Sequence, residues 1–255
     1  MSEQPFSVQF PETSQTMEQD EEQIIVTYNG EENHIRCHDY DQIYSIPGLY
    51  EYLFYEKLQC VSPKTVCSLL EQEIEQSPAD LSDLTVFDVG AGNGMVGEEL
   101  AKRGVESVTG LDIIEEAAEA TERDRPGVYD DYYVADLTEL PSKVEEALEE
   151  KPFNCLMTVA TLGFGDIPPL AFAQAYNFIS TSGWVAFNIK DKFLCQGDHS
   201  GFCRLIHQMA DNGILNISTQ HHYRHRLSLA GDPLHYIAIV GEKTDDVPLE
   251  LAEHV

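Results

Sequence analysis

The 255-residue chain has few basic residues: 15 Lys and Arg stand against 45 Asp and Glu, which gives a formal net charge of −30. Binding to nucleic acid depends on cationic side chains that neutralise phosphates, so this scarcity argues against a nucleic-acid substrate. It leaves a small molecule or a basic protein as the partner. Acidity spread this widely is also a common adaptation for solubility or for a salt-rich environment.

Long apolar runs are missing as well, since the chain contains no stretch of about 18 apolar residues that could span a membrane. The first residues are acidic and polar and do not have the pattern of a signal peptide. Six cysteines are scattered without paired spacing, which indicates reduced thiols and not a disulfide framework. We therefore expect a cytoplasmic protein with no membrane partner.

Metal-binding spacing is also absent. His221, His222 and His225 cluster near a predicted hairpin, and a second group of cysteines and histidines recurs every four residues from Cys195 to His207. Glycines interrupt any common helix in the second group, and neither group has the spacing of zinc ligands. We expect exposed histidines, buried cysteines and no metal site.

The chain divides into four expected segments. Residues 1–22 hold six carboxylates and no Lys or Arg, which predicts a disordered acidic tail. Apolar residues at helical spacing predict a helical cap over residues 23–80. A Rossmann-like domain is expected over residues 81–242, followed by a C-terminal tail over 243–255.

Within residues 81–242, short apolar strands alternate with helices of 10 to 15 residues. Helices are expected near 93–103, after residue 112, and near 170–179 and 202–209. Strands are expected over 85–89, 107–111, 132–135, 154–159, 184–189, 214–219 and 235–240. The fold class is therefore α/β: a doubly wound, seven-stranded, mostly parallel sheet with an antiparallel last strand, plus the N-terminal helical cap.

A glycine turn directly follows the first of these strands. Gly90, Gly92 and Gly94 come after Asp88 at a spacing of two, whereas the dinucleotide fingerprint requires the pattern G-x-G-x-x-G. A carboxylate beside the turn would repel a pyrophosphate and attract a sulfonium or ammonium group. The turn therefore favours S-adenosylmethionine (SAM) over NAD, although Asp88 could instead cap the following helix.

Two further acids close the next strands. Asp112 ends the second strand, where an acidic residue can accept hydrogen bonds from both ribose hydroxyls. Asp136 ends the third, where it could accept a hydrogen from the adenine amino group, with Leu137 as an apolar wall. The alternatives are a solvent-exposed Asp112 and a turn-forming Asp136. Three acids at successive strand ends make a more specific pattern than any one of them.

This arrangement resembles the class I SAM-dependent methyltransferases over roughly residues 84–242. The resemblance implies SAM as cofactor and methyl transfer to an unidentified small molecule. A similarity to the methyltransferase-like proteins of the Williams–Beuren region type, through Val159-Ala-Thr-Leu-Gly163, adds nothing about the substrate. The cofactor-binding residues that the resemblance implies are Asp88, Gly90, Ala91, Gly92, Gly94, Asp112, Ile113, Asp136, Leu137 and Val159.

The acceptor side is less defined by the sequence. The [DN]-P-P-[YFW] motif of enzymes that methylate amide or adenine nitrogens is absent, because Ile167 precedes Pro168-Pro169. Asp166 could accept a proton or instead cap the next helix, and Tyr40 could close over the ligand or simply pack in the cap. These two are the candidate catalytic residues. A catalytically inactive SAM-binding or scaffold protein of the same fold is the alternative function.

Overall fold

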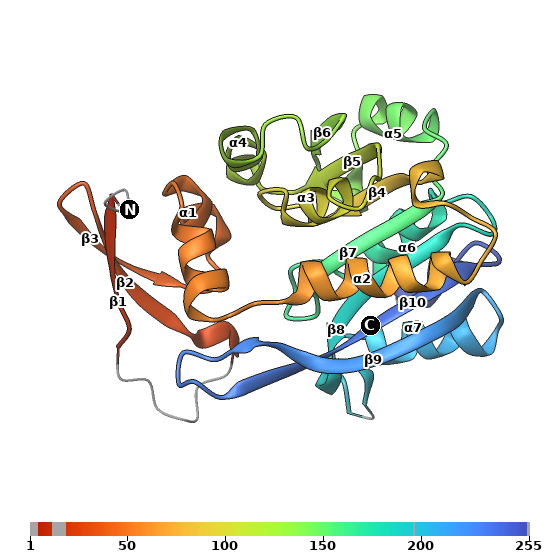
Figure 1. Ribbon diagram of the computed structural model, residues 1–255. Coiled ribbons are helices and arrows are strands. Elements are labelled where there is room, and N and C mark those ends of the chain that lie inside the picture. The colour runs from red at the N-terminus through yellow and green to blue at the C-terminus, as the bar shows by residue number, and fades with distance from the viewer. Residues whose placement is uncertain (1–4, 12–18, 196, 254–255) are drawn as a thin grey trace.

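The computed structural model describes residues 5–11, 19–195 and 197–253. A seven-stranded sheet with the order β6-β5-β4-β7-β8-β10-β9 dominates it (Figure 1). Its strands are β4 (Thr85–Val89), β5 (Ser107–Asp112), β6 (Asp131–Val134), β7 (Cys155–Leu162), β8 (Trp184–Lys190), β9 (Leu215–Leu227) and β10 (Pro233–Lys243). The expected α/β fold with a mostly parallel sheet is confirmed.

Strand direction follows from the connections. The strands β4 to β8 pair in parallel, and each is followed by a helix that carries the chain back across the sheet. β9 passes into β10 through a short turn over residues 228–232, so these two strands are antiparallel. β10 also pairs antiparallel with β8 on its other side. The antiparallel last strand is thereby confirmed.

Helices cover both faces of the sheet. Their bounds are α2 (Ser62–Glu75), α3 (Met95–Ala101), α4 (Glu115–Asp124), α5 (Ser142–Glu149), α6 (Pro169–Asn177) and α7 (Phe202–Asp211). The side chain of Val86 packs on the face that carries α2 and α3, whereas its neighbour Phe87 packs on the face that carries α5, α6 and α7. Helix α5 was not expected from the sequence.

The N-terminal unit is not all helical, so the expected helical cap over residues 23–80 is wrong for its first part. β2 (Gln23–Tyr28) and β3 (Glu31–Arg36) form a hairpin whose turn, Asn29-Gly30, has φ angles of 53° and 83°. Ile24 and Val26 are buried on one face of β2, which is the period of a strand. The helices α1 (Tyr40–Ser45) and η2 (Glu51–Lys57), the latter a π-helix, complete the unit.

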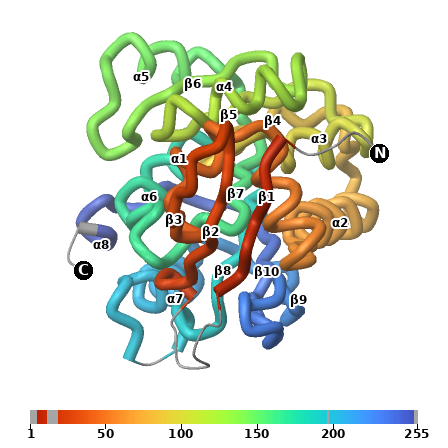
Figure 2. Tube along the Cα trace, turned by 90° about the vertical axis from the view of Figure 1, so that its left-hand side faces the viewer, coloured from red at the N-terminus to blue at the C-terminus, as the bar shows by residue number. Residues whose placement is uncertain are grey.

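The two expected tails also differ from the structure. Residues 1–4 and 12–18 lie outside the described residues, but β1 (Phe6–Gln9) pairs with β2, and the buried Phe6 ring contacts Tyr52. Figure 2 shows the three strands of this small sheet side by side in front of the large one. At the other end, Val247 and Ala252 are buried and α8 (Glu250–Glu253) lies beside α6 and α7. None of the helices in the described ranges is long and apolar enough to cross a membrane.

Candidate active site

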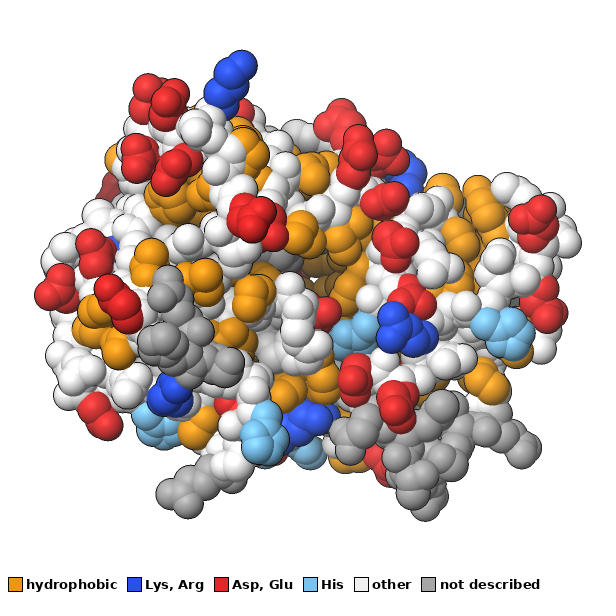
Figure 3. Space-filling model, turned by 180° about the vertical axis from the view of Figure 1, so that it is seen from behind, with side chains coloured by type: hydrophobic (Ala, Val, Ile, Leu, Met, Phe, Trp, Pro, Cys, Tyr) orange, Lys and Arg blue, Asp and Glu red, His pale blue; other side chains and the backbone are white. Residues whose placement is uncertain are grey.

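A cavity of about 230 Å³ lies where β4, β5, β6 and β7 end, with α1 and η2 on its other side. Open α/β sheets bind ligands at this carboxyl edge. From behind, the surface between the N-terminal unit and the large sheet is hollowed, and hydrophobic side chains border the hollow (Figure 3). Of the ten predicted cofactor-binding residues, eight line the cavity: Gly90, Ala91, Gly92, Asp112, Ile113, Asp136, Leu137 and Val159.

The glycine turn needs glycine for its backbone. Gly90, Gly92 and Gly94 have φ angles of 71°, 54° and 86°, a left-handed conformation that other residues adopt at a cost. A Cβ on Gly92 would lie 2.5 Å from the hydroxyl oxygen of Tyr44 in α1. The turn therefore brings bare backbone to the cavity wall, directly beneath the cap. Gly94 does not line the cavity and is instead the N-cap of α3.

Asp112 is the best-organised acid of the site. Its Oδ2 accepts the Gly92 N–H at 2.9 Å and its Oδ1 accepts the Ile114 N–H at 3.1 Å. The residue is only 8% exposed, so the solvent-exposed alternative is wrong. Burial raises the pKa of its carboxyl, although the backbone hydrogen bonds oppose this. The carboxylate is thus fixed at the cavity wall with lone pairs remaining for a ligand.

Two neighbouring residues extend this wall. Ile113 is 59% exposed although it is a large apolar side chain, and it lines the cavity beside Asp112. An exposed apolar residue at a cavity suits a flat apolar ligand surface. Asp136 accepts the Thr138 N–H through Oδ1 at 2.8 Å and caps the short helix that follows β6, so its turn-forming role is real. Because Asp136 also lines the cavity, the two roles are compatible.

Asp88 does not line the cavity with the other two acids. Its side chain leaves β4 on the face covered by α2 and α3, is fully buried, and accepts the Tyr129 hydroxyl hydrogen at 2.7 Å. The N-cap of α3 is Gly94, so the capping alternative is wrong as well. Burial raises the pKa of the Asp88 carboxyl to about 7; the Tyr129 hydrogen bond lowers it and the charge of Asp112 raises it further.

The Asp88 carboxyl should make folding stability depend on pH. Its pKa is 3.8 in the absence of the fold and about 7 within it, so the folded state binds the proton more tightly between these values. Its contribution is fully present below about pH 4 and is lost as the pH rises towards about 7. Asp88→Asn keeps an acceptor for Tyr129 and should be more stable than the wild type near pH 7 but not near pH 4.

Urea unfolding at the two pH values measures this difference. Asp83→Asn, at an exposed carboxyl just before β4, is the control for a change of net charge. If Asp88→Asn changed stability by the same amount at both pH values, the buried carboxyl would not be the source of the pH dependence.

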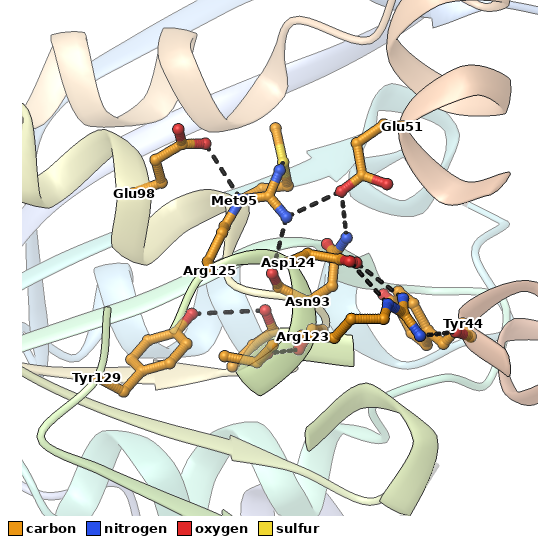
Figure 4. A network of polar contacts seen from close by, with 12 residues as sticks. Tyr44, Glu51, Asn93, Met95, Glu98, Arg123, Asp124, Arg125 and Tyr129 are labelled. Atoms are coloured by element: carbon orange, nitrogen blue, oxygen red, sulfur yellow. Dashed lines mark hydrogen bonds and ion pairs between the residues drawn. The ribbon is translucent and has the colours of Figure 1, made fainter. Parts of the chain in front are cut away.

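A polar network fastens the cap to the glycine turn (Figure 4). Glu51 in η2 accepts hydrogen bonds from the Asn93 side chain at 2.6 Å and from Arg125 at 2.9 Å. Arg125 also donates to the Asn93 carbonyl and contacts Glu98 and Met95. Charge-assisted bonds of this kind are stronger than neutral ones. The cap is thus held against the residues that shape the cavity.

Tyrosines of the cap form the wall opposite the sheet. Tyr40, Tyr44, Tyr50 and Tyr55 all line the cavity. The rings of Tyr44 and Tyr50 stack at 5.0 Å between centroids, and Tyr40 and Tyr44 stack at 6.1 Å. Tyr40 therefore packs in the cap and also faces the cavity. Aromatic rings in this position keep water away from a bound ligand.

The segment after β7 forms the remaining end of the cavity. Ala160 has a φ of 63°, and its N–H donates to the Asn188 side chain at 2.6 Å, which holds this uncommon backbone conformation in place. Asp166 follows a glycine-rich turn, and its Oδ2 lies 3.5 Å from Nδ1 of His38. The N-cap of α6 is Pro168, so the capping alternative for Asp166 is wrong.

Sequence reasoning missed several residues that the fold brings here. His38, Glu51, Asn93 and Tyr50 were not predicted to belong to the site. Asn93 had a signal, since it lies within the glycine turn. The expectation of exposed histidines and buried cysteines is wrong in part, because His225 is buried and Cys195 is exposed.

Residues 86–183 match the family model described as a methyltransferase domain. None of the curated protein sequences matches the chain. Among solved structures, an S-adenosylmethionine-dependent methyltransferase from Clostridium acetobutylicum is similar with a TM-score of 0.52 at 11% identity, over 77% of this chain and 96% of that one.

Two further structures are less similar. Magnesium protoporphyrin IX methyltransferase from Synechocystis, with bound SAH, has a TM-score of 0.49 at 15% identity, over 71% of this chain and 83% of that one. The ribosomal protein L11 methylase from Lactobacillus delbrueckii has a TM-score of 0.49 at 20% identity, over 71% and 79%. At 11% identity, the likeness to the Clostridium acetobutylicum structure is one of fold.

Proposed function

We propose that the protein transfers the methyl group of SAM to a small-molecule acceptor in the cavity beneath the cap. The match of residues 86–183 to the methyltransferase-domain family model supports this proposal. The observation that carries the proposal is the position of Asp112. Both of its carboxylate oxygens are oriented by backbone N–H groups at the wall of a cavity that apolar and aromatic side chains complete.

The residues of the cavity fit SAM. Asp112 would accept hydrogen bonds from the two ribose hydroxyls, and the exposed Ile113 would cover one face of the adenine. Asp136 and Leu137 would lie at the adenine edge. The turn at Gly90 and Gly92 would let the backbone approach the methionine part closely, because no side chain stands in the way.

SAM supplies an activated methyl group on a sulfonium. The protein's own task is to align the acceptor with that methyl and to exclude water. The tyrosines of α1 and η2 close the cavity from above, and the network around Glu51 and Arg125 holds them there. The net charge of −30 supports a small or basic acceptor over a nucleic acid. A cytoplasmic location is part of the proposal, and the free cysteines support it.

Titration calorimetry with S-adenosylhomocysteine (SAH), the demethylated product, tests the proposal. We expect micromolar affinity, with NADH as the control ligand that should not bind. Failure of both SAM and SAH to bind would overturn the proposal. Binding of SAM without methyl release across a broad panel of acceptors would instead favour a non-catalytic SAM-binding protein.

A further inference from the structure

A second, smaller cavity of about 30 Å³ lies behind the first, on the side of β9 and β10. Tyr236 of β10 and the consecutive residues His225 and Arg226 of β9 line it, together with Gln19 of the N-terminal segment. The two cavities meet at residues that line both of them: His38, Tyr40, Tyr50, Cys60, Ala160 and Asp166. The inner cavity therefore opens on the end of β7, away from the glycine turn and Asp112.

At this junction His38 and Asp166 face each other. His38 lies two residues before the start of α1, and Asp166 belongs to the turn after β7. Nδ1 of His38 and Oδ2 of Asp166 are 3.5 Å apart. The imidazole is largely buried, with 12% of its side chain exposed, and its ring contacts Phe164 edge-on at 5.3 Å. Since Nδ1 faces the carboxylate, Nε2 is the ring nitrogen that remains for another group.

The charged groups around His38 come from several elements. Asp39 is its chain neighbour and is paired with Arg36, and Lys190 and Lys192 lie over the Phe164 ring that His38 also contacts. Arg226, on the far side of the inner cavity, is paired with Glu22 at 2.8 Å. Asp166 is thus the carboxylate that directly faces the imidazole.

The other titratable groups at the junction are unsuited to accept a proton near neutral pH. Burial raises the pKa of Tyr40 and of Cys60, so both stay protonated. Burial, together with the charges of Arg226 and Lys190, lowers the pKa of His225 well below its ordinary value, and its Nδ1 already contacts Ser62 at 2.6 Å. His38, which faces Asp166, is therefore the remaining candidate for a base at the junction.

At about 30 Å³ the inner cavity admits a small polar group but no aromatic ring, so an aromatic molecule would lie at the junction, on the side of the larger cavity. The rings of Tyr40 and Tyr50 line both cavities there. At the far end of the inner cavity Gln19 donates to the Tyr236 hydroxyl at 3.0 Å, while its Oε1 is buried and has no partner among the described residues. A buried oxygen in this state calls for a donor, such as a water molecule in the inner cavity or a polar group of the acceptor.

We propose that a small phenolic acceptor binds at the junction of the two cavities and that His38, oriented by Asp166, removes its hydroxyl proton during methyl transfer; this inference depends on the proposed function. The phenolic oxygen forms the O–CH₃ bond as the S–CH₃ bond breaks. The sulfur keeps the electron pair of that bond and becomes a neutral thioether. The phenolic proton goes to Nε2 of His38, and the Asp166 carboxylate stabilises the resulting imidazolium.

Two probe acceptors separate this role from simple positioning. 4-Methylphenol has a pKa of about 10, as tyrosine does, and needs a base near neutral pH. 4-Nitrophenol is similar in size but is already ionised at about pH 9 and needs none. In His38→Gln, kcat for 4-methylphenol should fall by about 10²- to 10⁴-fold, whereas kcat for 4-nitrophenol at about pH 9 should stay near that of the wild type.

Two more variants complete the test. His34→Gln, at an exposed histidine of β3, is the matched control and should methylate both phenols as the wild type does. Asp166→Asn should lower kcat with 4-methylphenol much more than kcat with 4-nitrophenol at about pH 9, because the imidazolium that forms only with the first loses a stabilising charge. This second variant keeps the proposal testable if His38→Gln does not fold.

SAH binding, measured for every variant, separates the two proposals. A wild-type protein that does not bind SAH overturns the proposed function itself. A wild-type protein that binds SAH but methylates neither phenol overturns the phenolic acceptor alone. Equal losses with both phenols in His38→Gln would make His38 a positioning residue, and unchanged rates would remove it from the reaction.

Discussion

Asp112→Ala should weaken SAH binding by about 1–3 kcal/mol, or about 5- to 150-fold in Kd. A buried carboxylate that accepts two ribose hydrogen bonds contributes in this range, because both bonds involve a charged acceptor. The carboxylate is already oriented by Gly92 and Ile114, so little of the binding free energy is spent on ordering it. Titration calorimetry of the wild type and the variant measures the difference.

Glu106→Gln is the matched control, because it removes one charge just before β5 begins, whereas Asp112 ends that strand at the cavity. It should bind SAH as the wild type does. Asp112 also accepts the backbone N–H groups of the turn, so thermal unfolding of each variant is needed to show that the cavity is still formed. Unchanged affinity in a folded Asp112→Ala would exclude Asp112 as the ribose ligand.

The large sheet could be predicted because its signals are local. Each parallel strand is a short apolar run with a helix after it, and the predicted ranges agree with β4 at both ends and with the others to within a few residues, apart from β9 and β10, which are longer than expected. The small sheet had a local signal that was not used. Asn29-Gly30 between alternating apolar residues is the strongest short-range indication of a hairpin, and β2 and β3 form it.

The difference between Asp88 and Asp112 comes from one position along a strand. Asp112 is the last residue of β5 and reaches the cavity, whereas Val89 follows Asp88 and takes that place on β4. Since side chains alternate between the faces of a sheet, a shift of one residue moves a carboxylate from the edge into the interior. The sequence shows an acid near the end of each strand. Whether that acid is the last residue of its strand decides whether its side chain reaches the cavity.

The pair of His38 and Asp166 has no local signal of any kind. The two residues lie far apart in the sequence, and only the docking of the cap on the end of β7 brings them to 3.5 Å. The same holds for Glu51 and Arg125, which join η2 to the end of α4. Contacts between separately folded elements depend on tertiary packing, which neither periodicity nor a motif specifies.

The largest change in stability is expected at another such long-range pair. Glu22 and Arg226 form an ion pair at 2.8 Å with side chains that are 5% and 2% exposed, and Glu22 also accepts the Leu229 N–H. The pair joins the N-terminal segment to the β9–β10 hairpin. Glu22 was expected to lie in a disordered tail, because its neighbours in sequence are acidic and polar; its partner lies in β9.

Glu22→Ala should lower the free energy of unfolding by about 3–5 kcal/mol, since it leaves the Arg226 guanidinium buried without its counter-charge. Glu21→Ala, at the exposed neighbouring carboxylate, is the control and should change it by less than about 0.5 kcal/mol. The double variant Glu22→Leu with Arg226→Met should be more stable than Glu22→Ala, because no buried charge remains unpaired. Urea unfolding near neutral pH measures all three. Equal stability of Glu22→Ala and Glu21→Ala would mean that Arg226 reaches water in solution, and that the N-terminal segment is not held on the hairpin by this pair.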